Sequence, residues 1–291
     1  MKQRILAYLQ LVRMPNGFTA MADVLAGYLL VSGEGLSAGI LAALLAAAWA
    51  VYSGGCALND FCDRKVDARE RPERPIPSGR VSPTEALAAA CLCFAVGLAA
   101  AWTAGPPAFG VALFLVCSVV LYDGATKTRG FLGPINMGAC RAVNLLLGMA
   151  PGFAFRPLEM VFPLLTLAYV FSLTRLSRYE VTGAHGKWAW GILGGWGLTM
   201  AGLASLFAGG GLAKGGLVFS GVLLLLTGWA QARVLVRRDV PAVRSGVRIL
   251  ILSLPLLDAA YVAGVRGPAA ALSVLFFLVP ALFLSRYFQV T

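Results

Sequence analysis

Long apolar runs separated by short polar stretches dominate the chain from residue 17 to residue 285. These runs reach or approach the roughly 20 residues with which an α-helix crosses a bilayer. Strict alternation of the kind found in barrel strands is absent from them, and backbone groups in lipid must be satisfied within the segment, so we expect helices. The ten predicted spans lie near 17–32, 38–58, 83–104, 107–122, 132–151, 158–176, 188–208, 214–232, 247–265 and 268–285.

The charged residues fit the same arrangement. The chain is 59% hydrophobic and 13% charged, with 24 Lys and Arg against 13 Asp and Glu. If the N-terminus lies inside, most of the basic residues fall in inside loops and tails, in agreement with the positive-inside rule. The net charge of +11 therefore reports orientation, and we expect no nucleic-acid partner. The first 17 residues predict a short amphipathic helix in the membrane interface.

We therefore expect an all-α polytopic integral membrane protein with nine to ten transmembrane helices, built as a single transmembrane domain over residues 1–291. Hydropathy and the basic residues favour ten spans, which would put both termini on the inside. The spans are rich in Gly and Ala, as is typical of close helix–helix contacts in membranes.

The densest cluster of both charge signs is NDFCDRKVDARERPERPIPSGRVSPTEA, residues 59–86. Asn59, Asp63 and Asp67 are spaced i, i+4, i+8, so they lie along one stripe of a helix, and Asp60 borders that stripe. A row of oxygen donors at the inner end of a helix suits a hard cation such as Mg²⁺.

Basic residues follow the acidic stripe directly. Arg71, Arg74 and Arg80 lie on a loop that several prolines stiffen, and guanidinium groups match the geometry of phosphate. Ser82-Pro83-Thr84-Glu85 predicts a capping box that begins the next helix sharply. The combination is typical of a metal–diphosphate site. The alternative is a solvated loop in which Asp and Arg pair with one another and the basic residues fix topology.

These residues carry a resemblance to a known family. NDFCDRKVD followed by ERPERPIPSGRVS resembles the first signature of the UbiA superfamily of intramembrane prenyltransferases. Within the superfamily, the sequence ERPERPIPSGR is most similar to the EboC-like branch. LVRMPNGFTAMADVLAG at 11–27 is similar to the family's first helix, and YDGATK at 122–127 to its Tyr…Lys loop. The resemblance implies helices around a central cavity whose polar mouth faces the cytoplasm.

The resemblance also implies roles for individual residues. Asp63, Asp67 and Glu180 would be catalytic, and Asn59 and Asp60 would join them in holding Mg²⁺. The remaining implied residues would contact the substrate, either at the diphosphate or along the cavity: Asn16, Arg71, Arg74, Tyr122, Lys127, Arg141, Arg178 and Lys187. From its position within a span, Arg141 either lines the cavity or pairs with another helix. Asp23 and Asp258 either mark an acceptor pocket or pair with Arg141.

The second family signature is incomplete here. Members typically carry DxxxD after the sixth helix, and the matching stretch is SRYEVTGAHGK, 177–187. Glu180 falls at the first acidic position, but Ala184 replaces the second. The outcomes left open are one-metal catalysis with compensation by Arg178 or Lys187, a different leaving group, or binding without catalysis.

The resemblance implies Mg²⁺-dependent transfer of a prenyl group from a polyprenyl diphosphate to a small acceptor within the membrane, so the expected enzyme class is prenyltransferase. The alternative is a non-catalytic carrier or transporter of an isoprenoid lipid precursor that keeps the diphosphate site. Expected partners are the diphosphate donor, an acceptor and membrane lipid. The expected location is a bacterial inner membrane, with the polar site facing the cytoplasm.

Overall fold

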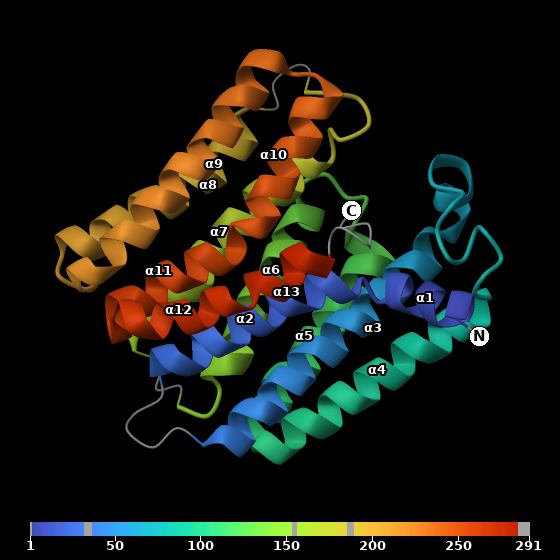
Figure 1. Ribbon diagram of the computed structural model, residues 1–291, viewed down its shortest axis with the longest axis horizontal. Helices are drawn as coiled ribbons and strands as arrows, with labels where there is room; N and C mark the ends of the chain where they lie inside the picture. Colours follow the sequence, from blue (N-terminus) through green and yellow to red (C-terminus); the bar gives the residue numbers. More distant parts are fainter. Residues whose placement is uncertain (1, 32–36, 153–155, 185–188, 285–291) are drawn as a thin grey trace.

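The computed structural model describes residues 2–31, 37–152, 156–184 and 189–284. All of the regular elements in these ranges are helical, as the apolar pattern predicts (Figure 1). The helices are α1 Lys2–Leu11, α2 Met14–Val31, α3 Ala38–Glu70, α4 Pro83–Ala104, α5 Pro106–Leu121, the π-helical turn η1 Tyr122–Thr126, α6 Leu132–Met149, α7 Pro157–Ser177, α8 Ala189–Ala208, the 3₁₀ turn η2 Lys214–Gly216, α9 Leu217–Arg237, α10 Val240–Leu252, α11 Leu254–Arg266, α12 Pro268–Phe276 and α13 Leu278–Leu284.

The helices occupy all ten predicted apolar segments. In the described residues, seven helical stretches are long and apolar enough to cross a membrane by length and composition. The total of nine to ten spans stays a prediction. The segment predicted at 247–265 begins earlier and is broken at Ser253, between α10 and α11. The break coincides with Pro255, which lacks a backbone donor and favours the first turn of a helix.

Helix α2 lies at the centre of the bundle, packed against α3, α6, α11, α12 and α13 (Figure 1). Its closest approach is to α6, where Gly27 lies against the backbone carbonyl of Leu145 and Gly148 lies against that of Val24. A Cβ atom at either glycine would overlap the facing backbone, so both positions need glycine for this packing. This contact holds the polar residues of α2 and α6 side by side.

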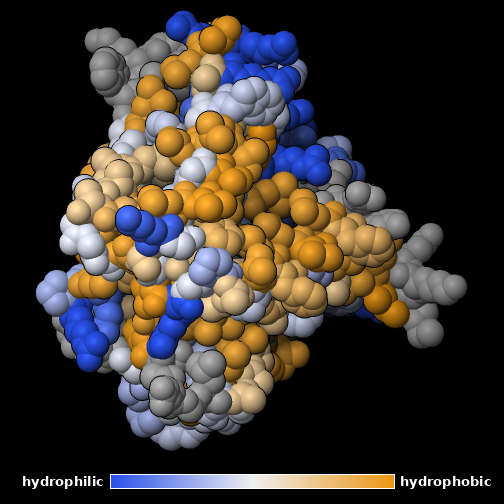
Figure 2. Space-filling view, turned by 60° about the vertical axis from the view of Figure 1, so that its left-hand side comes forward, coloured by the Kyte–Doolittle hydropathy of each residue, from blue (hydrophilic) through white to orange (hydrophobic). Residues whose placement is uncertain are grey.

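The outside of the bundle is apolar over a broad area. Figure 2 shows continuous hydrophobic side chains across the middle of one face, with hydrophilic groups toward its ends. The exposed large side chains include Leu92 and Trp102 on α4, Phe114 on α5, Leu225 on α9 and Phe276 on α12. Such a surface is suited to contact with lipid tails.

The polar end of the bundle is organised by α1 and by the loop between α3 and α4. Ala7 and Leu11 of α1 are buried against Ile76 and Val81 of this loop. The predicted capping box is present, because the Ser82 side chain accepts from the backbone of Glu85 while the Glu85 carboxylate accepts from the Ser82 backbone. The loop is therefore fixed over the end of α3.

Candidate functional site

The inner end of α3 carries the acidic stripe, and the arginine loop folds back onto it. The Arg74 guanidinium donates to Asp67 Oδ2 at 2.7 Å and to Asp60 Oδ1 at 3.3 Å. All three side chains are almost fully buried. Arg74 therefore joins two carboxylates that lie seven residues apart on α3, and its predicted contact with diphosphate would require these ion pairs to open.

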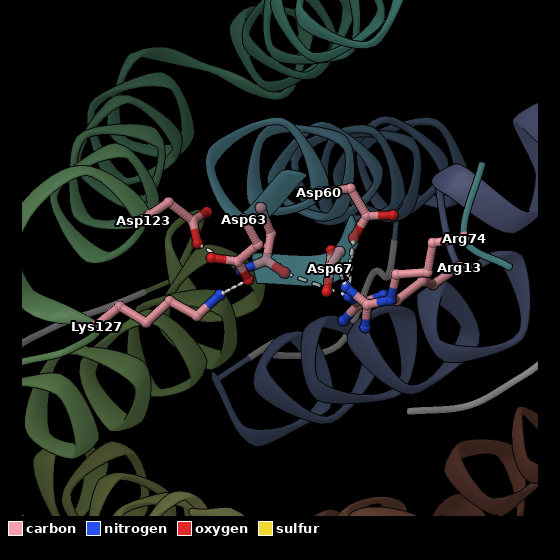
Figure 3. Close-up of polar contacts among 8 residues, drawn as sticks. Arg13, Asp60, Asp63, Asp67, Arg74, Asp123 and Lys127 are labelled. Atoms are coloured by element: carbon pink, nitrogen blue, oxygen red, sulfur yellow. Dashed lines mark hydrogen bonds and ion pairs between the residues drawn. The ribbon is translucent and has the colours of Figure 1, made fainter. Parts of the chain in front are cut away.

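Asp63 faces the opposite way, toward the turn that follows α5 (Figure 3). Its carboxylate pairs with the Lys127 ammonium, and both side chains are about one quarter exposed. Asn59 lies one turn earlier on α3, and its Nδ2 donates to Asp123 Oδ1 at 2.7 Å. The predicted stripe is thus divided: Asp60 and Asp67 belong to one group, and Asn59 and Asp63 belong to another.

Two residues of this site were missed by the sequence interpretation. Arg13 donates to Asn59 Oδ1 at 3.2 Å and to Asp60 Oδ1 at 3.0 Å. It occupies the junction between α1 and α2, with a left-handed φ of 46° that directs the chain into α2. Asp123 comes from η1 and reaches the same face of α3. The sequence signal that could have identified Asp123 was its position directly after Tyr122 in the YDGATK motif.

The donor chemistry of this end of α3 fits a hard divalent cation. Asn59, Asp63, Asp67 and Asp123 supply oxygen donors, which Mg²⁺ prefers over nitrogen or sulfur. In the described part of the chain, no three acidic, thiol or imidazole groups converge as a ready-made metal cage. That is compatible with Mg²⁺, which commonly takes one or two carboxylates and completes its shell with water and phosphate oxygens.

The second acidic stretch is directed elsewhere. Burial raises the pKa of the Glu180 carboxyl, and the positive charges of Arg71 and Arg244 oppose that rise. Arg244 Nε also donates to the Glu180 carbonyl at 3.1 Å. Ala184, at the second family position, is fully buried in the main hydrophobic cluster, and its backbone donates to the Arg238 carbonyl. This loop is therefore anchored to α10 and to the turn before it.

Arg178 contacts backbone carbonyl groups, whereas the resemblance implies contact with substrate. Its guanidinium donates to the carbonyl of Gly130 at 2.6 Å and to that of Lys127 at 3.1 Å. Gly133 makes room for it, since a Cβ there would lie 2.7 Å from Arg178 Nη2. Tyr122 is buried beside the acidic turn. Lys187 lies outside the described residues.

A second polar cluster lies deeper, where α2, α6 and α11 meet. Arg141 Nε lies 2.9 Å from Asp23 Oδ2, which also accepts from Asn144 at 2.9 Å. The pairing predicted as one alternative for Arg141 is therefore present. The Asp258 carboxyl of α11 is buried close to that of Asp23.

Asn16 and Thr19 connect the two clusters along α2. Both are buried, and they lie with Asp23 at i, i+3 and i+7 on one face of the helix. Thr19 donates to the Asn16 carbonyl at 2.7 Å and accepts from Arg141 at 3.0 Å. A continuous polar strip thus runs from the α3 site into the bundle.

Comparisons with known proteins give a family match and a fold match. The profile of the UbiA prenyltransferase family matches residues 20–175. A digeranylgeranylglyceryl phosphate synthase from Methanopyrus kandleri is 36% identical over 186 residues, which cover 64% of this chain and 67% of the relative. One from Ignicoccus hospitalis is 32% identical over 177 residues, which cover 59% of this chain and 57% of that protein. The chain thus spans less than two thirds of the second relative.

Solved structures show the same fold. A structure of digeranylgeranylglyceryl phosphate synthase superposes with a TM-score of 0.70 at 19% identity, covering 91% of this chain and 99% of the other. A UbiA homologue from Archaeoglobus fulgidus bound to GPP and Mg²⁺ gives a TM-score of 0.58 at 13% identity, covering 93% and 99%. At these identities the likeness concerns the arrangement of helices.

Proposed function

Because this chain belongs to the UbiA prenyltransferase family, we propose that it transfers a prenyl group from a polyprenyl diphosphate to a small acceptor within the membrane. The observation that carries the proposal is the inner end of α3. There, oxygen donors for a divalent cation lie beside Lys127, Arg13 and Arg74 on a bundle whose outer surface is apolar. The metal-bound neighbour from Archaeoglobus fulgidus supports it by analogy.

The roles of the residues follow from their chemistry. Asn59 and Asp63 would hold Mg²⁺, and Asp67 would join them once Arg74 leaves it for the diphosphate. The cation would neutralise charge that develops on the leaving diphosphate. Lys127 would exchange its contact with Asp63 for the diphosphate, and Arg71 would approach from the end of α3. Asp60 is held by Arg13 and Arg74, so its role is to keep these cations in place. The π-face of Tyr122 would stabilise the allylic cation and help exclude water.

The remaining predicted residues have narrower roles in this proposal. Asn16 and Arg141 would line the polar strip that leads from the α3 site into the bundle. Arg178 would fix the turn that carries Lys127, and Glu180 would hold Arg71 near the end of α3 by its opposite charge. The chain is an integral membrane protein, whereas a bacterial membrane and a cytoplasmic site remain predictions from loop charge.

The test is a reaction in detergent with labelled farnesyl and geranylgeranyl diphosphates, Mg²⁺ and a panel of acceptors. The panel includes geranylgeranylglyceryl phosphate, because the relatives are named for a digeranylgeranylglyceryl phosphate product. We expect Mg²⁺-dependent prenylation that Asp63→Ala abolishes and that Glu70→Gln, an exposed carboxylate on the same helix, leaves unchanged. Product formation by Asp63→Ala at the wild-type rate would refute the proposed site.

A non-catalytic isoprenoid carrier is the second candidate. It is favoured by Ala184, which is buried in the apolar core and offers no second metal ligand. The carrier would bind the same labelled diphosphates in the presence of Mg²⁺ and return them intact. Recovery of unreacted donor from a saturated complex, with every acceptor of the panel, would favour this candidate over the enzyme.

A further inference from the structure

We infer that Asp123 is a carboxylate ligand of the divalent cation, supplied by the η1 turn in place of the carboxylate that residue 184 lacks. The inference rests on the proposed function and extends its ligand set beyond α3. It follows from the position of Asp123, from the backbone that presents it and from the absence of a direct ion pair to its carboxylate among the described residues.

The position of Asp123 is fixed by Asn59. The Asn59 amide donates to Asp123 Oδ1 at 2.7 Å, so the two side chains lie in direct contact across α3 and η1. In Figure 3 the Asp123 carboxylate points toward the same group that contains Asp63 and Lys127. A cation bound by Asn59 and Asp63 would therefore lie within reach of a third oxygen donor.

The backbone of η1 is adapted to this presentation. Lys127 N donates to the Tyr122 carbonyl at 2.9 Å, an i to i+5 bond that widens the last turn after α5. Single π-helical turns occur frequently at functional sites, because the additional residue changes the direction of the following side chains. Here the turn brings both Asp123 and Lys127 onto α3.

The charges around Asp123 differ from those around its neighbours. Asp60 and Asp67 pair with Arg74, and Asp63 pairs with Lys127. In the described ranges no Lys or Arg nitrogen lies within 4 Å of the Asp123 carboxylate, whose hydrogen-bonding partner is the neutral Asn59 amide, although Lys127 and Arg13 act on it from farther away. A half-buried carboxylate without a directly paired cation is costly. A bound divalent ion would supply that charge.

The same comparison explains why the second signature can be incomplete. Glu180 is associated with Arg71 and Arg244, and Ala184 packs in the core. Glu180 is therefore the one carboxylate at 177–184, and the Arg71 and Arg244 cations act on it. Asp123 supplies one carboxylate to the site from the η1 turn. It thereby replaces the carboxylate that the site lacks because residue 184 is Ala.

The test is an electron paramagnetic resonance titration of the purified full-length protein with Mn²⁺, which shares the oxygen preference of Mg²⁺. Geranylgeranyl thiolodiphosphate, a poorly ionising donor analogue, is present throughout. Asp123→Asn keeps an oxygen that accepts from Asn59 and removes the charge. We expect its Mn²⁺ dissociation constant to rise at least about tenfold, while the exposed control Glu70→Gln matches the wild type.

Additional variants separate a ligand from a merely structural residue. Asp123→Glu keeps the carboxylate and should recover part of the affinity that the amide variant loses, at an unchanged melting temperature without Mn²⁺. Equal Mn²⁺ affinity in the wild type and Asp123→Asn would overturn the inference and leave the proposed function intact. A wild-type protein that binds no Mn²⁺ in the presence of the analogue would overturn both.

Discussion

At the scale of single residues, the site depends on which carboxylates carry a compensating charge. Asp60 is contacted by Arg13 and Arg74, which makes it part of a buried ion-pair network. Asp63 is paired with Lys127, whose mobile ammonium can exchange one anionic partner for another. The acidic residues near α3 are therefore unequal, although they occupy similar positions in the sequence motif.

Ala184 provides a direct test of the incomplete second signature. Because its side chain is fully buried in the hydrophobic cluster, Ala184→Asp would place a carboxylate in an apolar environment. We expect this change to lower the free energy of unfolding by about 3 kcal/mol without increasing metal affinity. Thermal unfolding in detergent and a Mn²⁺ titration measure the two effects.

The matched control is Val181→Asp, which adds the same charge at an exposed position of the same loop. It should leave stability nearly unchanged. A stable Ala184→Asp protein with tighter Mn²⁺ binding would show that the loop can form the second half of the metal site.

At the scale of elements, local signals in the sequence predicted the features of α3 and the loop that follows it. The i, i+4, i+8 spacing of Asn59, Asp63 and Asp67 indicated a helical stripe, and the Ser82–Glu85 capping box is present. The contacts of Arg13 and Asp123 with α3 were not predictable in this way. They join residues far apart in sequence and depend on how α2 and η1 pack.

The first turn of α6 offers a test of this packing. A Cβ at Gly133 would lie 2.7 Å from both Arg178 Nη2 and the Lys127 carbonyl, so Gly133→Ala should displace the turn that carries Lys127. We expect about a tenfold loss of kcat/KM for the diphosphate donor, because small misplacements of binding groups are costly. Steady-state kinetics with varied donor measure it.

Gly130→Ala is the matched control, since a Cβ at Gly130 has no neighbour within 4 Å. It tests the same substitution three residues earlier, in the loop before α6, without the overlap. Equal kinetics for the two variants would contradict the role assigned to this turn.

At the scale of the whole molecule, the buried carboxyl groups of Asp23 and Asp258 connect α2 with α11. Asp23 Oδ1 and Asp258 Oδ2 are buried without a hydrogen-bond donor in the described ranges, and the two carboxyl groups lie close to each other. We expect one proton, shared between the two carboxyl groups, to satisfy both oxygens. Together with Arg141, the cluster is then electrically neutral, as a membrane interior favours.

This protonation state predicts unequal effects of the two amide substitutions. Asp258→Asn supplies an N–H donor where the shared proton lies, so stability should change by less than about 1 kcal/mol. Asp23→Asn removes the carboxylate that pairs with Arg141 and should cost about 3 kcal/mol. Thermal unfolding of both variants in the same detergent gives the comparison. Equal losses of stability in the two variants would contradict a shared proton that resides on Asp258.

The family's first signature indicated the α3 site from sequence, whereas the deeper cluster was left with two alternatives. Arg141, Asp23 and Asp258 were recognised as buried ionisable residues, but their partners depend on the crossing of three helices. The structure assigns Arg141 to Asp23. The similarity to the EboC-like branch remains a prediction from the residue sequence of one motif.

The most direct test of the central claim is a single-turnover reaction of wild-type protein saturated with labelled geranylgeranyl diphosphate. Mg²⁺ and geranylgeranylglyceryl phosphate are added together, and released diphosphate and prenylated product are quantified against time. Catalysis at the α3 site predicts equal amounts of both, formed only with Mg²⁺ and absent in Asp63→Ala. Saturable donor binding with no diphosphate released over the whole acceptor panel would contradict it and identify a carrier.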